Sequence, residues 1–199
     1  YVLGNSDFCG VKLNVDKRVL IPRFETEILA NRAVEEIGDK KARVLDLCTG
    51  SGCIASVIAR GTDADIVAAD VSDEALQVAT ENLKGLGVAV VKSDMFESLD
   101  GKFDLIVSNP PYVRSADIDG LQPQVTAQPR IALDGGDDGL KFYKIIAECA
   151  GKFLTDDGVI MVEVGYDQAA DVVKLFEKSG KCEVVKDLDG IERIVICRK

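Results

Sequence analysis

The tetrapeptide Asn109-Pro110-Pro111-Tyr112 contains the residue types needed to hold a planar nitrogen for methylation. Such a nitrogen, in an amide or an exocyclic amine, is a poor nucleophile because its lone pair is delocalised. The Asn109 side-chain carbonyl and the Pro110 backbone carbonyl can each accept one N–H of a substrate NH2 group, which turns the lone pair toward an electrophilic methyl group. The prolines stiffen the backbone, and Tyr112 offers a flat wall. We predict that Asn109, Pro110 and Tyr112 are catalytic and that all four residues bind substrate; a stiff turn without chemistry is the alternative.

A glycine-rich turn over residues 46–55 supplies a second set of candidates. Gly50 and Gly52 allow the backbone to turn tightly and to approach a ligand without a Cβ in the way. Asp70, twenty residues after Gly50, can accept hydrogen bonds from ribose hydroxyls. Asp94 and Met95 place an acceptor beside an apolar side chain, which suits an adenine ring. The residues predicted to bind a nucleoside cofactor are Asp46, Cys48, Thr49, Gly50, Ser51, Gly52, Asp70, Asp94, Met95 and Asn109.

The glycine spacing alone does not identify the cofactor. Residues 50–55 also fit the G-x-G-x-x-A pattern of dinucleotide-binding proteins, so an NAD-dependent oxidoreductase is a competing hypothesis. The segment 109–112 favours methyl transfer, because a dehydrogenase has no known use for an Asn-Pro-Pro-Tyr segment at that place.

Composition excludes several other kinds of chemistry. The 199 residues include no histidine, which rules out a Ser-His-Asp triad, a Cys-His pair and a His-ligated metal site. The six cysteines form no C-x-x-C pair, so we expect free thiols and no metal. The net charge of −10 disfavours direct binding of nucleic acid. No apolar run approaches the ~20 residues needed to cross a membrane, and we expect a cytoplasmic enzyme.

The elements that must position these residues form an alternating strand–helix pattern. Strands are predicted at 44–47, 66–69, 88–91, 103–107 and 159–164. Helices are predicted from Glu25 to Gly38 and at 54–59, 73–84, 140–151 and 168–178. This alternation specifies an α/β fold whose parallel sheet is covered on both faces, with ligands at the carboxyl ends of the strands. The turn at 187–190 joins predicted strands 182–185 and 191–197 and is too short for parallel pairing, so one antiparallel strand should lie near the edge.

Two further segments stand outside this alternation. Residues 1–21 are predicted to form a small β-hairpin appendage before a main domain over 22–199, because apolar and polar residues alternate over 11–16. The turn of this hairpin is predicted at 4–7. The connection 113–138 shows no clear periodicity, and loops longer than ~12–15 residues are typically lids or binding loops.

Several segments resemble motifs of the HemK/PrmC-type protein-(glutamine-N5) methyltransferases. Segments 46–52 and 109–112 are shared with many N-methyltransferases, including DNA adenine enzymes. The segments more specific to this family are Val19–Glu27 (VLIPRFETE), Pro129–Leu133, Gly135–Leu140 and Glu163–Gln168, and the resemblance covers essentially the whole chain. The departures are Phe24 in place of Pro, Cys48 in place of Gly, Met95 in place of an aromatic residue and Gln128 in place of Glu.

The resemblance implies a Rossmann-like methyltransferase with a mostly parallel seven-strand sheet and S-adenosyl-L-methionine as methyl donor. It implies that the adenosine lies along 48–52, Asp70 and 94–95, and that 109–112 hold the glutamine of the Gly-Gly-Gln motif of a peptide-chain release factor. Because the chain starts at Tyr1 rather than Met, it is expected to be part of a longer protein. The resemblance implies a helical substrate-docking module upstream of residue 1.

Several questions stay open at this point. Arg23, Thr26 and Glu163 either contact the cofactor or support the site. The alternatives for function are a ribosomal-protein glutamine methyltransferase, a nucleic-acid adenine-N6 methyltransferase, and an inactive cofactor-binding partner subunit. The acidic charge disfavours the second, and the intact segment 109–112 disfavours the third.

Overall fold

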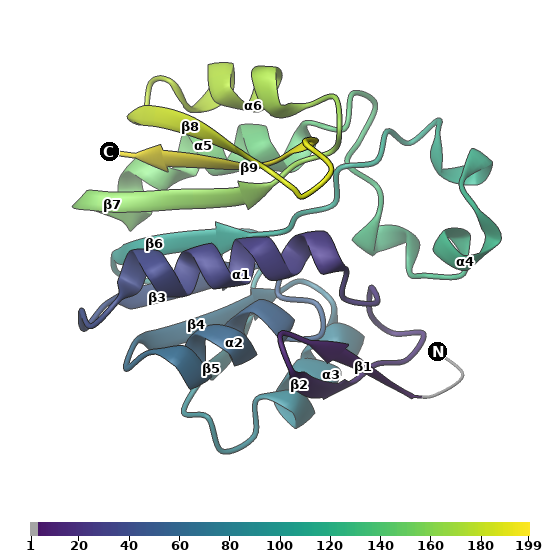
Figure 1. The fold of residues 1–199 in the computed structure, drawn as a ribbon, viewed down its shortest axis with the longest axis horizontal. Helices are drawn as coiled ribbons and strands as arrows, with labels where there is room; N and C mark the ends of the chain where they lie inside the picture. The colour runs from purple at the N-terminus through teal and green to yellow at the C-terminus, as the bar shows by residue number, and fades with distance from the viewer. Residues whose placement is uncertain (1–3) are drawn as a thin grey trace.

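A seven-strand sheet forms the centre of the protein in the computed structural model, which describes residues 4–199 (Figure 1). The strands are β3 (Arg43–Leu47), β4 (Asp65–Asp70), β5 (Ala89–Lys92), β6 (Phe103–Ser108), β7 (Leu154–Glu163), β8 (Lys181–Lys186) and β9 (Glu192–Arg198). Their order is β5-β4-β3-β6-β7-β9-β8, and β9 pairs antiparallel with both of its neighbours. The predicted mostly parallel sheet, with one antiparallel strand near the edge, is therefore confirmed.

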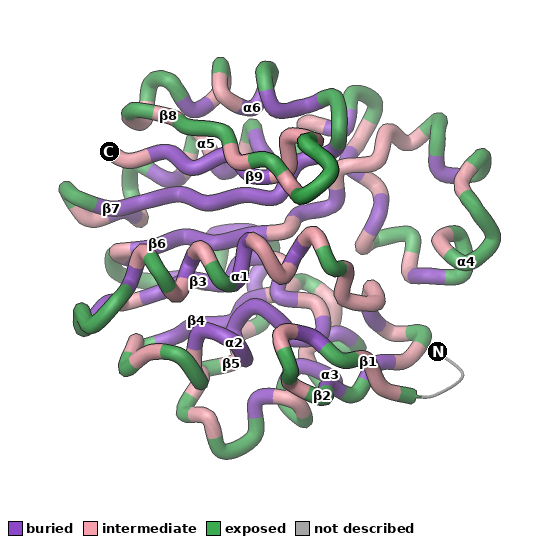
Figure 2. Tube along the Cα trace, in the orientation of Figure 1, coloured by how far each residue is buried: buried purple, intermediate pink, exposed green. Residues whose placement is uncertain are grey.

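Helices cover both faces of this sheet because successive strand residues point to opposite sides. On β3, Val44 belongs to one buried cluster and Leu45 to the other. The first cluster takes apolar side chains from α1 (Phe24–Ile37), α2 (Cys53–Gly61) and α3 (Asp73–Asn82). The second takes them from α5 (Lys141–Phe153) and α6 (Ala169–Phe176). Figure 2 shows the central strands as a continuous buried layer.

The helix predicted from Glu25 to Gly38 ends where expected, and a serine caps the start of α3. Gly38 follows α1 with a φ of 54°, a left-handed conformation that glycine adopts without a steric penalty. Ser72 caps α3, because its hydroxyl accepts a hydrogen bond from the N–H of Ala75 at 3.2 Å.

The N-terminal hairpin forms as predicted, but its turn lies elsewhere. Strands β1 (Asn5–Phe8) and β2 (Val11–Asn14) pair antiparallel, so the segment predicted as the turn is a strand. The turn is at Cys9 and Gly10, with φ values of 48° and 75°, which match the right-handed twist of a tight hairpin. The hairpin packs on α3, where the N–H of Asn14 donates to Oδ1 of Asn82 at 2.8 Å.

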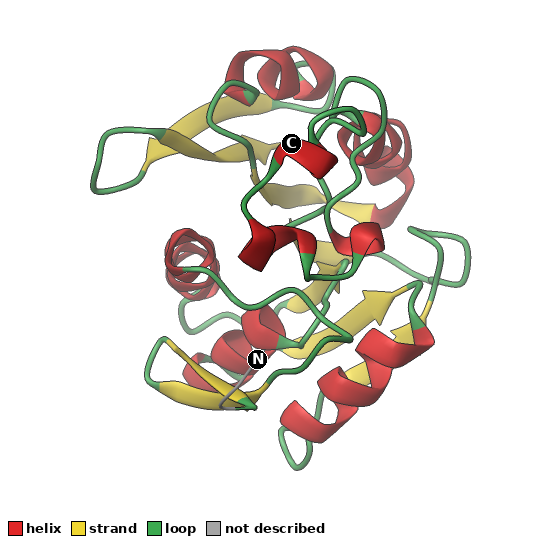
Figure 3. Cartoon of the chain, turned by 90° about the vertical axis from the view of Figure 1, so that its right-hand side faces the viewer, coloured by secondary structure: helices red, strands yellow, loops and turns green. Residues whose placement is uncertain are grey.

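The connection 113–138 contains more structure than the sequence indicated. It includes two 3₁₀ turns, η1 (Ile118–Gly120) and η2 (Arg130–Ala132), and the four-residue helix α4 (Pro123–Thr126). Arg130 joins its parts through ion pairs with Asp119 at 3.1 Å and Asp134 at 3.5 Å. In Figure 3 these short helices lie in front of the edge at which the parallel strands end. Across residues 4–199, no helix is long and apolar enough to cross a membrane.

Candidate active site

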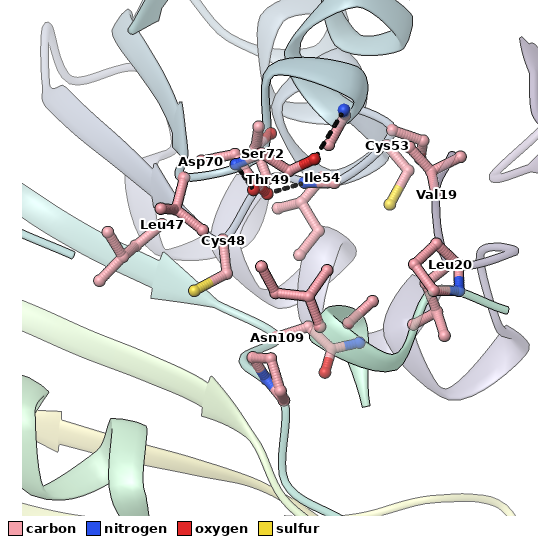
Figure 4. A pocket seen from close by; sticks show the side chains of 18 of the residues that line it. Val19, Leu20, Leu47, Cys48, Thr49, Cys53, Ile54, Asp70, Ser72 and Asn109 are labelled. Carbon is pink, nitrogen blue, oxygen red and sulfur yellow. Dashed lines mark hydrogen bonds between the residues drawn. The ribbon is translucent and has the colours of Figure 1, made fainter. Parts of the chain in front are cut away.

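A cavity of about 930 Å³, including its open mouth, lies at the carboxyl ends of β3, β4, β5 and β6. The loops after β3 and β6 are held together beneath it. Leu47 and Ser108 are partners in the parallel register, and the Ser108 hydroxyl donates to the carbonyl of Leu47 at 2.6 Å. Figure 4 shows Asp70, Thr49 and Ser72 on one side of the cavity, Val19 and Leu20 on the opposite side, and Asn109 below them.

Most of the predicted cofactor residues line this cavity. Those that do are Cys48, Thr49, Gly50, Ser51, Asp70, Asp94, Met95 and Asn109. The glycines of the turn serve different purposes. Gly50 lines the cavity with a φ of 56°, and a Cβ there would meet no atom within 4 Å. Gly52 has a φ of 79° and lies against the C-terminal end of α3. A Cβ there would lie 3.1 Å from the side chain of Leu83, which caps that helix.

We predicted that Asp46 binds the cofactor, but this residue does not line the cavity. It is buried behind the glycine turn. Its Oδ2 accepts hydrogen bonds from the Thr49 hydroxyl at 2.6 Å and from the N–H of Ala55 at 3.0 Å. Its Oδ1 is buried without a partner, and burial raises the pKa of Asp46 to about 7. Asp46 therefore ties the glycine turn to the first turn of α2.

Asp70 ends β4 and faces the cavity. Its Oδ2 accepts from the N–H of Gly50 at 2.9 Å, and its Oδ1 accepts from the N–H of Ser72 at 3.0 Å. The pKa of Asp70 is raised above its ordinary value, because the effect of burial exceeds the opposing effect of these two backbone donors. Each carboxylate oxygen retains a second lone pair, so Asp70 can also accept ribose hydroxyls.

Met95, which we predicted to lie beside an adenine ring, contacts a second sulfur-containing side chain in the cavity lining. Sγ of Cys48 lies 3.9 Å from Sδ of Met95. Both residues have a left-handed backbone, with φ values of 60° and 47°, although neither is glycine. A polarizable sulfur surface is well suited to pack on an aromatic ring.

A second cavity of about 1570 Å³, including its open mouth, adjoins the first. Leu20, Asn109 and Ala132 line both cavities. Pro111 lines only the first, whereas Pro110 and Tyr112 line only the second. Asn109 therefore stands at the junction where a group must pass from one cavity to the other.

Hydrogen bonds extend from Asn109 to the core. Nδ2 of Asn109 donates to Oγ1 of Thr26 at 3.1 Å, and the Thr26 hydroxyl donates to Oε2 of Glu163 at 2.6 Å. The Tyr112 hydroxyl donates to Oε1 of the same carboxylate at 3.3 Å. Burial raises the pKa of Glu163 to about 7. Thr26 lines the first cavity and Arg23 the second, while Glu163 lies beneath both.

Glycines of the family-specific segments pack directly against the Pro-Tyr backbone. A Cβ on Gly135 would lie 2.7 Å from Cα of Tyr112 and 2.9 Å from the carbonyl oxygen of Pro111. A Cβ on Gly139 would lie 2.5 Å from the Tyr112 carbonyl oxygen, which also accepts from Nε2 of Gln168 at 2.9 Å. These segments hold the predicted catalytic loop in place.

Two cavity-lining segments were not predicted to be at the cofactor. They are residues 18–20 before α1, and Pro129, Ile131 and Ala132 in the long connection. Each overlaps a family-specific motif, but no residue in them has an obvious nucleoside-binding role. Gln128, which stands where the family usually has Glu, joins these segments because its Oε1 accepts from the N–H of Ile21 at 3.0 Å.

The residues of the first cavity fit S-adenosylmethionine, which supplies an electrophilic methyl group on a cationic sulfur. Asp70 offers acceptors for the ribose, Gly50 leaves open space beside the loop, and Cys48 and Met95 form an apolar surface. Asp94, a further acidic side chain of the lining, adds negative charge that suits a cation.

Comparisons with known proteins show which family the chain resembles. The methyltransferase small domain family matches residues 8–137. A release factor glutamine methyltransferase of Geobacter sulfurreducens is 42% identical over 98% of this chain and 71% of its own length. A ribosomal protein uL3 glutamine methyltransferase of Francisella tularensis is 44% identical over 85% of this chain and 57% of its own length. A methyltransferase structure from Pyrococcus furiosus has the same fold, with a TM-score of 0.73 at 17% identity over 96% of this chain and 90% of that one.

The fold and the two cavities define a Rossmann-like, S-adenosylmethionine-dependent methyltransferase. Within that class, the chain belongs to the release factor glutamine methyltransferase family.

Proposed function

We propose that this protein transfers a methyl group from S-adenosylmethionine to the side-chain nitrogen of the glutamine in the Gly-Gly-Gln motif of a peptide-chain release factor. The observation that carries the proposal is the pair of acceptors at the junction of the cavities. Neither Oδ1 of Asn109 nor the carbonyl oxygen of Pro110 accepts a hydrogen bond from any residue within 4–199. These two oxygens are suited to receive the two N–H groups of a primary amide.

The chain's own residues act by positioning. Asn109 and Pro110 orient the amide so that its lone pair faces the first cavity, and Tyr112 packs against its flat face. The proton leaves after methyl transfer, so no strong base is needed. Asp70 and the glycine turn hold the donor on the opposite side of the junction.

The remaining features of the proposal concern partners and location. The names of the relatives support a release factor as substrate. The net charge of −10 and the absence of histidine support a reaction without nucleic acid binding and without metal. A substrate that acts in translation supports action in the cytoplasm.

Mass spectrometry tests the substrate. The protein is incubated with methyl donor and, separately, with a purified release factor, ribosomal protein uL3 and adenine-containing DNA. We expect one added methyl group on the Gly-Gly-Gln peptide of the release factor. A methyl group on uL3 or DNA alone would overturn the proposal.

The variant Asn109→Ala tests the role of the amide acceptor in the same assay. We expect kcat to fall by ~10²–10³, the usual effect of losing one preorganised polar contact, while donor affinity stays nearly unchanged. Asn109→Asp should be milder, because it retains an oxygen acceptor. An Ala variant with more than half of the wild-type rate would contradict the orienting role.

A further inference from the structure

We propose that Glu163, acting through Thr26, is a positioning residue that determines which way the side-chain amide of Asn109 faces. The inference deepens the proposed function and rests on it for its catalytic consequence. It assigns a role to Thr26 and Glu163, two buried polar side chains that do not contact the reacting atoms in the proposed reaction. Thr26 is 2% exposed and Glu163 is 1% exposed.

The direction of each hydrogen bond follows from the chemistry of the groups. An ionised carboxylate can only accept, so the Thr26 hydroxyl must donate its single hydrogen to Glu163. The Thr26 oxygen then has only lone pairs left for Asn109, and it accepts from Nδ2 at 3.1 Å. The NH2 group of Asn109 is thereby held toward α1, and Oδ1 is left for the substrate.

The opposite orientation of the amide would be unfavourable on both sides. Oδ1 of Asn109 would face a Thr26 oxygen that has no hydrogen left to give. Its NH2 group would face the NH2 group of the substrate glutamine, so two donors would meet. A residue that lacks a fixed partner would sample both orientations, and only one of them orients the substrate nitrogen.

The same carboxylate also holds the aromatic wall. Its Oε1 accepts from the Tyr112 hydroxyl at 3.3 Å, so Asn109 and Tyr112 are both positioned by Glu163. The Glu163 backbone is fixed in turn, because its carbonyl accepts from the Tyr143 hydroxyl at 2.8 Å. The titratable and charged groups around Glu163 and Tyr112 come from every neighbouring element. They are Arg23 and Glu25 at the start of α1, Cys53 on α2, Tyr112 after β6, Tyr143 on α5 and Arg193 on β9.

Two variants at Thr26 distinguish the effect of its hydroxyl on Asn109 from the effect of its packing in the core. Thr26→Val keeps the shape and removes the hydroxyl, whereas Thr26→Ser keeps the hydroxyl. We expect Thr26→Val to lower kcat by ~10- to 100-fold with little change in the KM for the donor, and Thr26→Ser to recover most of the loss. Thr155→Val is the matched control, because the Thr155 hydroxyl donates to the Asp104 carboxylate at 3.1 Å far from the junction. It should keep the wild-type kcat.

The variant Glu163→Gln adds a pH readout. Below about pH 7, Glu163 gains a proton, and one of its oxygens becomes a donor that competes for the Thr26 oxygen. The wild-type kcat should therefore fall on the acid side of this pH. Glu163→Gln should have a lower kcat at pH 8, by roughly 10-fold, without that acid limb. A wild-type profile flat through pH 7, or an unchanged limb in Glu163→Gln, would overturn the proposal.

A readout independent of activity distinguishes this inference from the proposed function. The side-chain NH2 signals of Asn109 in a 1H–15N spectrum are assigned by their absence from Asn109→Ala. They should shift and exchange faster in Thr26→Val and stay unchanged in Thr155→Val. If the wild-type protein methylates no Gly-Gly-Gln glutamine, the proposed function fails while these signals still decide the role of Thr26. Unchanged Asn109 signals in Thr26→Val, or equal kcat for Thr26→Val and wild type, would overturn the inference.

Discussion

Asp70 performs two tasks at the end of β4, since it binds the glycine turn through backbone donors and faces the cavity with its remaining lone pairs. A single side chain at this site thus combines a structural role with a position that suits the proposed binding of the donor. Asp46 performs only the first of these tasks, because it lies behind the same turn. The two aspartates should therefore respond differently to substitution.

We expect Asp70→Ala to weaken donor binding by roughly 10- to 150-fold, which corresponds to ~1.5–3 kcal/mol for leaving ribose hydroxyls unpaired. Isothermal titration calorimetry with S-adenosylmethionine measures this change. Asp73→Ala is the matched control, because Asp73 lies exposed at the start of α3 in an ion pair with Lys92. Unchanged affinity in Asp70→Ala, or tight binding of NAD by the wild type, would contradict the assignment of the cavity.

Cys48 carries backbone strain in the cofactor loop, with a φ of 60°. The left-handed conformation costs a non-glycine residue ~1 kcal/mol or more, and a β-branched residue is strained further. We expect Cys48→Gly to raise the free energy of unfolding by up to about 1 kcal/mol, and Cys48→Val to lower it by about 1–3 kcal/mol. Denaturant unfolding measures both. A large loss of stability in the glycine variant would show that the contact with Met95 outweighs the strain.

At the scale of elements, the segment before α5 supports the loop 109–112, which we propose to be catalytic. Gly135 leaves no room for a Cβ beside the Pro111 and Tyr112 backbone. Close packing against the 111–112 backbone therefore accounts for the glycines at positions 135 and 139 of the motif Gly135–Leu140.

We expect Gly135→Ala to displace the 109–112 loop and to lower kcat by ~10-fold or more, while donor affinity stays nearly unchanged. Gly151→Ala in α5 is the matched control, since a Cβ there meets no atom within 4 Å. That variant should keep kcat and gain about 0.5–1 kcal/mol from lower chain entropy in the unfolded state. Steady-state kinetics and thermal unfolding measure the pair. Wild-type kcat in Gly135→Ala would refute the supporting role.

At the scale of the whole molecule, the stability of this protein of net charge −10 should depend on pH through its shifted carboxyl groups. Burial raises the pKa values of Asp46 and Glu163 to about 7, from ordinary values of 3.8 and 4.5. Half-buried Asp16 has the opposite shift, because its hydrogen bonds with Arg18 lower its pKa to about 2. Stability should therefore decline on both sides of a mildly acidic optimum.

The sign of the alkaline decline follows from proton linkage. Between about pH 4 and about pH 7, the folded protein holds protons on Asp46 and Glu163 that the unfolded chain has lost, so the free energy of unfolding falls as pH rises. In this window, each group lowers the free energy of unfolding by up to ~1.4 kcal/mol per pH unit. Thermal unfolding of the ligand-free protein from about pH 5 to about pH 8 should show a falling Tm. Asp46→Asn should flatten the slope, and a Tm that rises through this range would contradict the assignment.

The sequence alone determined the alternating α/β pattern, the antiparallel last hairpin and the residues of the two central motifs. These features are local, because strand and helix periods, glycine turns and Asn-Pro-Pro-Tyr are each encoded within a few neighbouring residues. Only the tertiary structure decided that residues from the segments 18–20 and 129–132 line the first cavity and that Asp46 lies behind the loop. It also joined Glu163 to Thr26 and Thr26 to Asn109, which are 137 and 83 residues apart in the chain. Contacts at such separations depend on the order of the strands in the sheet and on how α1 packs against it. Local sequence periodicity does not determine either.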